Sequence, residues 1–412
     1  MSDQTKSQAE SKVDQKPNGI HQDGKVDFEA KAKPETSAPE TTQNESSEGT
    51  EELRSATTER RAVLQHTLSE HEHSDDEEDP VPQEPIDADE DLLDDCDPDC
   101  DEIDLIKLRI SSIPALNLSR FPNLRRLCLR ENLITSLPGL PTSLTELDLY
   151  DNRLPTHALT ASESTLHLLK DLETLDLSYN KIRAIPESLA SDHPELRNLY
   201  FVQNKISKIQ GVSGLQHLHY LELGANRIRV IENLENLPSL QLLWLGKNKI
   251  TSIGSGLSTL TNLRTLAIQS NRITSLEGLE ALTALEELYV SHNGITSLTT
   301  EATEDKPAES YLKHNTNLRV IDISNNRIEH LTGLSHLRKL EELWASNNQI
   351  ASFDEIEREL GGRKEEDGET IVKTVYFEGN PVQRNNEVLY RGKVRMALPE
   401  IEQIDATYVR VA

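Results

Sequence analysis

The chain has 412 residues, a net charge of −28 and only 4% aromatic residues, and residues 1–100 carry 29 acidic against 9 basic side chains. Residues 71–102 contain seventeen acidic residues and no Lys or Arg, a block that should repel DNA, RNA and anionic membranes. No stretch approaches the roughly 20 apolar residues of a membrane-spanning helix, and the N-terminus lacks the apolar core of a signal peptide.

Residues 1–102 are predicted to be a disordered acidic tail. The first hundred residues contain one aromatic residue, Phe28, and too little apolar surface to offset the entropy of ordering them. The three cysteines, Cys96, Cys100 and Cys128, cannot form a disulfide framework, which favours a reducing compartment. No Cys or His stands near Cys96 and Cys100 at ligand spacing, so we expect no metal site there.

An internal repeat organises the chain after residue 102. The pattern L-x-x-L-x-L-x-x-N begins eleven times between Leu124 and Val372, mostly at intervals of 22 to 24 residues, which is the leucine-rich repeat. Each start is followed eight residues later by an asparagine: Asn132, Asn152, Asn180, Asn204, Asn226, Asn248, Asn271, Asn293, Asn326, Asn348 and Asn380.

The repeat predicts an α/β leucine-rich-repeat solenoid of about 12 units, spanning residues 103–382, with a concave sheet of parallel strands. Its strand leucines should point into a shared core, and the stacked asparagine amides should satisfy backbone groups at each turn. An N-terminal capping unit with Leu108 in place of the asparagine should precede the repeats. Residues 383–412 break the period and should close the far end as a helix and a turn. The extra residues in the three longer gaps are expected to be loops or short helices beside the array.

The residue between the two strand leucines should lie on the concave face in every repeat. This column reads Cys128, Asp148, Asp176, Tyr200, Glu222, Trp244, Ala267, Tyr289, Asp322, Trp344 and Tyr376. Five of the eleven are aromatic, including both tryptophans of the chain, and four are acidic. Because strand propensity alone would also place Val, Ile and Thr here, the column indicates a binding surface. An open arc of roughly 40 Å suits a protein with basic charge and apolar hollows better than a small ligand.

A second column follows the asparagines: Arg153, Lys181, Lys205, Arg227, Lys249, Arg272 and Arg327. These basic residues could meet an acidic ligand or nucleic acid, but the favoured interpretation is a solvated edge that keeps the array soluble, as runs of charge usually are. The lack of interleaved aromatic residues and the negative overall charge count against nucleic acid. The sequence contains no phosphate-binding loop, zinc-protease motif or nucleophile elbow, so we expect neither an enzyme nor a cofactor.

Several segments resemble the leucine-rich-repeat regulatory subunit 7 family of protein phosphatase 1 across residues 102–412. They include "LDLSYNKI", "LELGANRIRVIENLENL" and the ending "MALPEIEQIDATYVR". The resemblance implies a non-catalytic nuclear and cytoplasmic protein that holds the phosphatase catalytic subunit in its concave face and acts in mitosis and chromosome segregation. It also implies a ternary complex with a small inhibitor protein. The implied partner-binding residues are Asp176, Tyr200, Glu222, Trp244, Asp322, Glu342, Trp344 and Tyr376, to which the concave column adds Tyr289.

Two departures and one motif accompany this resemblance. The family pattern has phenylalanine where this chain has Tyr200 and Trp244, so the contacts stay aromatic while their fit changes. In the tail, Lys25, Val26 and Phe28 match a short docking motif found in many partners of this phosphatase, although so degenerate a pattern also arises by chance. The alternative function is a general acidic repeat scaffold that binds basic nuclear or chromatin proteins.

Overall fold

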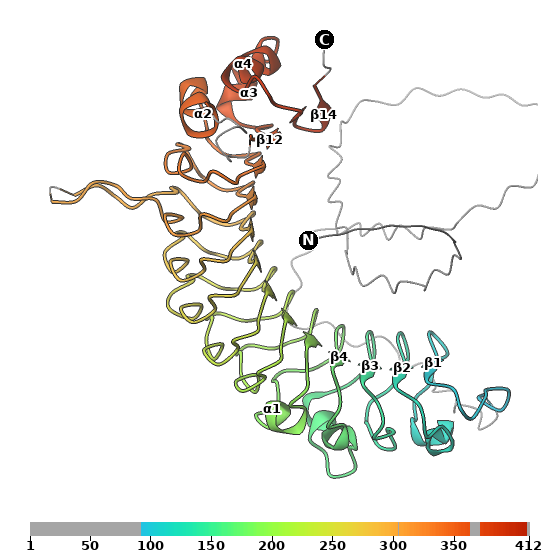
Figure 1. The fold of residues 1–412 in the computed structure, drawn as a ribbon. Coiled ribbons are helices and arrows are strands. Elements are labelled where there is room, and N and C mark those ends of the chain that lie inside the picture. The colour runs from blue at the N-terminus through green and yellow to red at the C-terminus, as the bar shows by residue number, and fades with distance from the viewer. Residues whose placement is uncertain (1–91, 304, 363–370, 410–412) are drawn as a thin grey trace, which may run out of the picture. The chain divides into compact units, whose positions relative to one another are not determined.

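The computed structural model describes residues 92–303, 305–362 and 371–409, which form a curved stack of repeats (Figure 1). Its fourteen strands pair in chain order, and the register from β1 to β13 is parallel throughout. Twelve of them are three-residue strands of successive repeats, as the sequence predicts: β1 Glu102–Asp104, β2 Arg126–Cys128, β3 Glu146–Asp148, β4 Thr174–Asp176, β5 Asn198–Tyr200, β6 Tyr220–Glu222, β7 Leu242–Trp244, β8 Thr265–Ala267, β9 Glu287–Tyr289, β10 Val320–Asp322, β11 Glu342–Trp344 and β12 Thr374–Tyr376.

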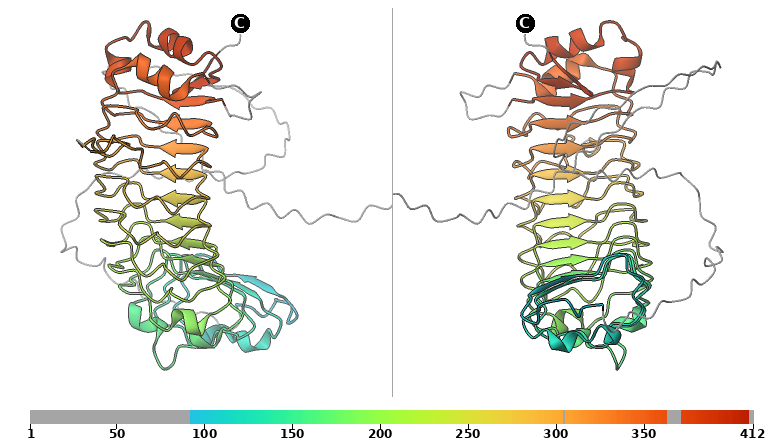
Figure 2. Two further views of the ribbon diagram at one scale, coloured as in Figure 1. Left: turned by 60° about the vertical axis from the view of Figure 1, so that its left-hand side comes forward. Right: turned by 90° about the vertical axis from the view of Figure 1, so that its right-hand side faces the viewer.

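The strand register puts equivalent residues of the repeats side by side (Figure 2). Leu243 of β7 is aligned with Leu221 on one side and Leu266 on the other, and all three are fully buried. Because side chains alternate along a strand, the neighbouring Trp244 points away from this core. The repeat period therefore fixes which residues form the core and which form the concave face.

The asparagines form the predicted hydrogen-bond ladder at the turn after each strand. Asn248 donates from Nδ2 to the carbonyl oxygens of Leu223 (2.9 Å) and Leu245 (3.0 Å), and its Oδ1 accepts from the backbone N–H of Ile228 (3.0 Å). The residue before each asparagine adopts a left-handed conformation, with φ of 54° at Lys247. Its backbone N–H donates to the next repeat, which offsets the cost of that conformation for a residue with a Cβ.

Helices are few, and turns cover most of the convex side of the array. The short helices are η1 Pro114–Leu116, η2 Leu118–Arg120, η3 Thr156–Leu159, η4 Leu166–Leu168 and α1 Leu189–Asp192. The extra residues in the gap after Leu144 form η3 and η4. Those in the gap after Leu285 form an arm closed by a bridge between Thr299 and Ser310, which projects from the convex side in Figure 1.

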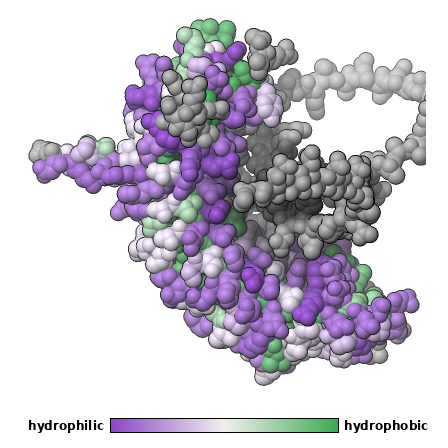
Figure 3. Space-filling view, viewed as in Figure 1, coloured by the Kyte–Doolittle hydropathy of each residue, from purple (hydrophilic) through white to green (hydrophobic). Residues whose placement is uncertain are grey.

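The C-terminal end closes the array as a helix and a turn, which confirms the prediction of a cap. Helices α2 Phe353–Leu360, α3 Pro381–Arg384 and α4 Tyr390–Ala397 lie at this end, followed by strands β13 Gln403–Ile404 and β14 Thr407–Tyr408. Buried Ile401 and Ile404 cover the last repeat, and β14 turns back antiparallel to β13. Hydrophobic residues such as Val388 and Met396 remain exposed on the cap, where Figure 3 shows green atoms above a mostly hydrophilic surface.

The predicted boundary of the acidic tail at residue 102 is wrong for its last eleven residues, since the structure describes residues 92–101 and Glu102 already belongs to β1. Residues 92–101 pack against the open end of the array, where Leu93 is only 3% exposed. The carbonyl oxygen of Asp101 accepts from the backbone N–H groups of Arg125 (2.7 Å) and Arg126 (3.0 Å). The first repeat would otherwise leave apolar surface open to water, and this segment covers it although its composition is acidic. The predicted disorder of residues 1–91 concerns a segment outside the described residues.

In the part of the chain that the structure describes, no helix is both long and apolar enough to cross a membrane.

Candidate partner-binding face

Every predicted partner-binding residue lies on the concave face, on the strand positions that alternate with the core leucines. Each repeat contributes three outward positions to this face: the residue of the central column and the residues two before and two after it. Glu342 occupies the position two residues before Trp344 and faces the same side, as predicted. Eight of the nine predicted residues are partly exposed there: Asp176, Tyr200, Glu222, Trp244, Tyr289, Glu342, Trp344 and Tyr376.

Three members of the central column are buried, contrary to the expectation that the whole column is open. Cys128 is 1% exposed, Ala267 is fully covered and Asp322 is 9% exposed. For Ala267 and Asp322 the cause is size, because each short side chain lies between large rings on the two neighbouring strands. Asp322 also turns its carboxylate towards the backbone, where Oδ1 accepts from the N–H of Ser324 at 2.9 Å.

Four aromatic rings form a continuous row along the C-terminal half of the concave face. The ring centroids of Trp244 and Tyr289 are 6.2 Å apart, those of Tyr289 and Trp344 are 6.3 Å apart, and those of Trp344 and Tyr376 are 5.8 Å apart. Trp244 and Tyr289 stand two strands apart, a backbone separation of roughly 10 Å. Their rings meet because they lean over the small Ala267 between them. We call this set (Trp244, Tyr289, Trp344, Tyr376) the aromatic row.

Carboxylates beside the aromatic residues are held by hydrogen bonds from them. The Trp344 Nε1–H donates to Glu342 Oε2 at 3.2 Å, and the Tyr289 hydroxyl donates to Glu287 Oε2 at 3.2 Å. On β6 the Tyr220 hydroxyl donates to Glu222 Oε2 at 2.8 Å. In all three pairs the residues are two apart on one strand, and one carboxylate oxygen is fixed in place. Sequence reasoning missed Glu287 and Tyr220, although the spacing that identified Glu342 would have found both.

The N-terminal part of the concave face is acidic and partly neutralised. Arg130 Nε lies 3.1 Å from an oxygen of Asp148, and its guanidinium stacks 4.4 Å from the centroid of the Tyr150 ring. Burial raises the pKa of the Asp148 and Asp176 carboxyls, although backbone N–H groups that donate to them oppose this shift. These carboxylates therefore lack full solvation on the free face, and a cation placed against them would be stabilised.

Burial also perturbs titratable groups in the middle of the face. It raises the pKa of the Tyr200 hydroxyl to about 12, with the neighbouring Glu222 adding to the shift. The pKa of Glu222 is itself raised by burial. The Tyr200 and Tyr220 rings pack at 4.8 Å between centroids. This cluster presents apolar ring surface together with a carboxylate whose charge is poorly solvated.

Other candidates from the sequence lie elsewhere. Lys25, Val26 and Phe28 of the candidate docking motif fall outside the described residues. Among the described residues, no group of three or more His, Cys, Asp or Glu side chains is placed to hold a metal ion.

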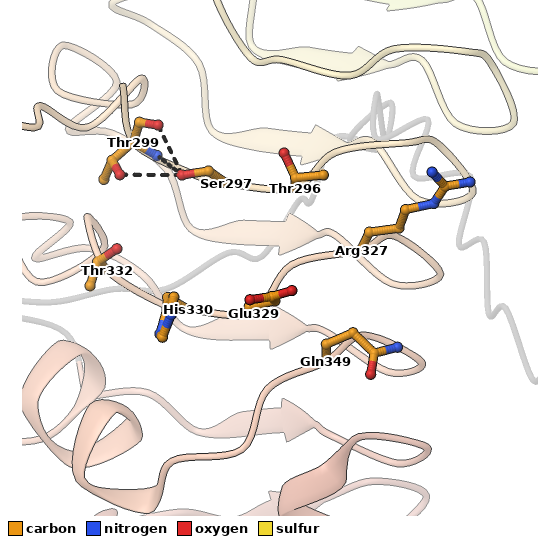
Figure 4. A pocket seen from close by; sticks show the side chains of 8 residues that line it. All are labelled: Thr296, Ser297, Thr299, Arg327, Glu329, His330, Thr332 and Gln349. Atoms are coloured by element: carbon orange, nitrogen blue, oxygen red, sulfur yellow. Dashed lines mark hydrogen bonds between the residues drawn. The ribbon is translucent and has the colours of Figure 1, made fainter. Parts of the chain in front are cut away.

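A polar hollow of about 690 Å³ opens on the flank of the array, away from the concave face (Figure 4). It is lined by Thr296, Ser297, Thr299, Arg327, Glu329, His330, Thr332 and Gln349, which come from the segments that leave the strands. It lacks aromatic side chains, so the apolar anchors typical of protein interfaces lie on the concave face instead.

Comparisons with known proteins match this architecture. A family model described as Leucine Rich repeats (2 copies) matches residues 216–259, 261–301 and 316–358, and a Leucine Rich Repeat model matches residues 171–191. The internalin InlF of Listeria monocytogenes has the same fold, with a TM-score of 0.52 at 22% identity over 75% of this chain and 87% of its own.

Two curated relatives have closer sequences. Protein phosphatase 1 regulatory subunit SDS22 of Schizosaccharomyces pombe is 49% identical over 324 residues, which cover 79% of this chain and 90% of that protein. The Protein phosphatase 1 regulatory inhibitor subunit PPP1R7 homolog of Arabidopsis thaliana is 34% identical over 160 residues, which cover 37% of this chain and 46% of that protein.

Proposed function

Because this chain belongs to the SDS22 family of protein phosphatase 1 regulatory subunits, we propose that it binds the phosphatase catalytic subunit in its concave face. It is a regulatory protein and not an enzyme. Binding would control the assembly, localisation and activity of the phosphatase.

The aromatic row is the observation that carries this proposal. Trp and Tyr dominate the energetic centres of protein interfaces because they bury large rings at little cost in side-chain entropy. The row places four such rings in contact on a face that nothing else in the described chain covers, with successive centroids 5.8 to 6.3 Å apart. A preformed row of this kind loses little freedom on binding, which favours a tight complex.

The carboxylates on the same face define the chemistry of the partner surface. Glu222 accepts a hydrogen bond from the Tyr220 hydroxyl, and Glu342 accepts one from the Trp344 Nε1–H. The Asp176 carboxylate is poorly solvated. Lys or Arg side chains of a partner would neutralise them, while apolar hollows would receive the rings. The surface of the catalytic subunit that binds here is therefore expected to be basic around apolar depressions.

The cellular setting is part of the proposal. We propose that the complex acts in the nucleus, and also in the cytoplasm, during mitosis and chromosome segregation, and that a small inhibitor protein joins it in a ternary complex. The resemblance in sequence supports this setting. The Lys25, Val26 and Phe28 motif would add a weak second contact, which raises overall affinity through its effective concentration.

The test is direct binding of the purified phosphatase catalytic subunit to the full-length chain by calorimetry. Trp244→Ala and Trp344→Ala should each weaken binding by about thirtyfold, because truncating an aromatic anchor commonly costs about 2 kcal/mol. Leu168→Ala is the control, since Leu168 is an exposed apolar residue of η4 outside the concave face. Unchanged affinity in both tryptophan variants would rule out the concave face as the binding surface.

A further inference from the structure

Basic side chains gather on one flank of the array, where the chain leaves strands β4 to β8. We call this surface the basic flank and define it as residues 179–184, 203–208, 225–230, 247–252 and 270–275. It carries nine basic residues and no acidic one: Lys181, Arg183, Lys205, Lys208, Arg227, Arg229, Lys247, Lys249 and Arg272. Such a bias is unexpected in a chain whose net charge is −28.

On the opposite flank, where the chain enters the strands, charged side chains form ion pairs between neighbouring repeats. There, basic residues alternate with acidic ones on neighbouring repeats. Arg197 lies 3.2 Å from Glu173, Arg264 lies 3.2 Å from Glu286, and Arg319 lies 2.9 Å from Glu341. Charges on that flank are therefore neutralised within the chain. A surface that serves only solubility would be expected to mix both signs in the same way.

The basic flank lacks such internal neutralisation. Within the ranges that the structure describes, no ion pair is formed by Arg183, Lys205, Lys208, Arg229, Lys249 or Arg272. Five of these six side chains are exposed, and Lys249 is half-buried. Equivalent residues of neighbouring repeats lie about one strand spacing apart, roughly 5 Å, where like charges repel. An anionic partner would relieve this repulsion.

We propose that the basic flank is a second docking surface, which binds an acidic polypeptide segment of a partner protein. The flank lies beyond the turn that ends each strand, whereas the proposed phosphatase surface lies on the strands. The two surfaces also have opposite charge, so they select different partners. The five repeats span four strand spacings, roughly 19 Å, which corresponds to about six residues of extended chain.

The side chains between the bases favour a polypeptide over a single-stranded nucleic acid. Proteins that bind single-stranded nucleic acids combine Lys and Arg side chains with aromatic rings, on which the nucleotides stack. On the basic flank the intervening exposed residues are Ser, Thr, Gln and Val. The one aromatic residue of the flank, Tyr179, already packs on Tyr150, with 4.7 Å between the ring centroids. Carboxylates need only the flexible ammonium and guanidinium groups that this surface supplies.

The experiment measures binding of a fluorescent oligoglutamate peptide to the full-length chain by anisotropy. The variant Lys205→Gln, Lys249→Gln, Arg272→Gln is compared with the control Arg197→Gln, Arg264→Gln, Arg319→Gln, which changes the net charge equally on the opposite flank. The first variant should bind the peptide about tenfold more weakly, since three exposed ion pairs are lost together. The control should bind as the parent chain does, and thermal denaturation verifies that both variants fold.

Four results would overturn the proposal. They are failure of the parent chain to bind the peptide, equal loss in both variants, tighter binding of an oligothymidylate than of oligoglutamate, and carbodiimide cross-links from Lys205 or Lys249 to residues 1–91 of the same chain in place of the peptide. The last would identify the chain's own acidic segment as the occupant. Cross-links from these lysines to the peptide, together with selective loss in the first variant, would support the proposal. Phosphatase binding serves as a separate readout, because the first variant leaves every concave-face residue intact.

Discussion

Replacing Asn248 with alanine tests the ladder that joins the repeats. The side chain makes four hydrogen bonds, three from Nδ2 to the carbonyl oxygens of Leu223, Leu245 and Gly246, and one to Oδ1 from the N–H of Ile228. Asn248 is 7% exposed, so water does not readily replace the lost amide. The four backbone groups are affected unequally, and this inequality sets the expected size of the effect.

The three carbonyl oxygens each keep another donor. Leu223 still accepts from Nδ2 of Asn226, Leu245 accepts from Nδ2 of Asn271, and Gly246 accepts from a backbone N–H. The Ile228 N–H, in contrast, loses its one acceptor among the described residues. Leaving one buried donor unsatisfied costs about 1–3 kcal/mol, and three weakened bonds add to it, so we expect a loss of about 3 kcal/mol. This is a large fraction of the stability of an ordinary domain.

The assay is urea denaturation followed by tryptophan fluorescence, together with hydrogen exchange at the Ile228 amide. Since repeat arrays need not unfold in one step, exchange reports the local loss directly. Asn262→Ala is the control, because Asn262 is an exposed asparagine with a single bond of 2.9 Å to the carbonyl oxygen of Pro238. It should change stability by less than about 1 kcal/mol. Equal effects of the two variants, with unchanged exchange at Ile228, would refute the ladder as a source of stability.

The other predictions concern the proposed complex. Association with the phosphatase should slow as salt increases, and changing Asp176, Glu222 and Asp322 to Asn or Gln should lower the on-rate and flatten this dependence, as stopped-flow measurements would show. Burial holds the pKa of Asp176 above its ordinary value of 3.8 on the free face, whereas a basic partner would lower it. Binding should therefore release a proton and strengthen as pH rises through the window just above 3.8, a rise that calorimetry should find reduced in Asp176→Asn. Val26→Ala with Phe28→Ala should weaken full-length binding if the tail docks, and an unchanged Kd, alone and with Trp244→Ala, would show that the repeats act alone.

The sequence by itself determined the repeat and nearly everything that depends on its period. Each asparagine of the ladder, each core leucine and the outward direction of Trp244 follow from spacing, because a parallel stack puts equal repeat positions in line. The closing cap was also predictable, since an array with an open end would expose its core. Gly379 directly precedes the last asparagine of the ladder, the position at which every repeat has a positive φ. Its φ is 75°, and a Cβ there would collide with Asn347 Oδ1.

The tertiary structure decided which concave residues form a surface together. The column of residues read from the sequence does not give the direction in which each side chain leans. It could not show that Ala267 lies beneath the two rings that lean over it. Nor could it show that Glu287 is held by Tyr289, a contact that depends on how two neighbouring side chains turn. Residues 92–101 were misassigned for a related reason, because their order comes from the surface they cover and not from their own composition.

Charge pairing shows most plainly what the sequence determines and what only the folded array decides. The sequence contains both Arg197 and Lys205, eight residues apart and equal in charge. Only the folded array places Arg197 beside Glu173 on one flank and Lys205 among other bases on the opposite one. Coulomb interactions depend on distance in space and on solvation, both of which are set by how neighbouring repeats stack.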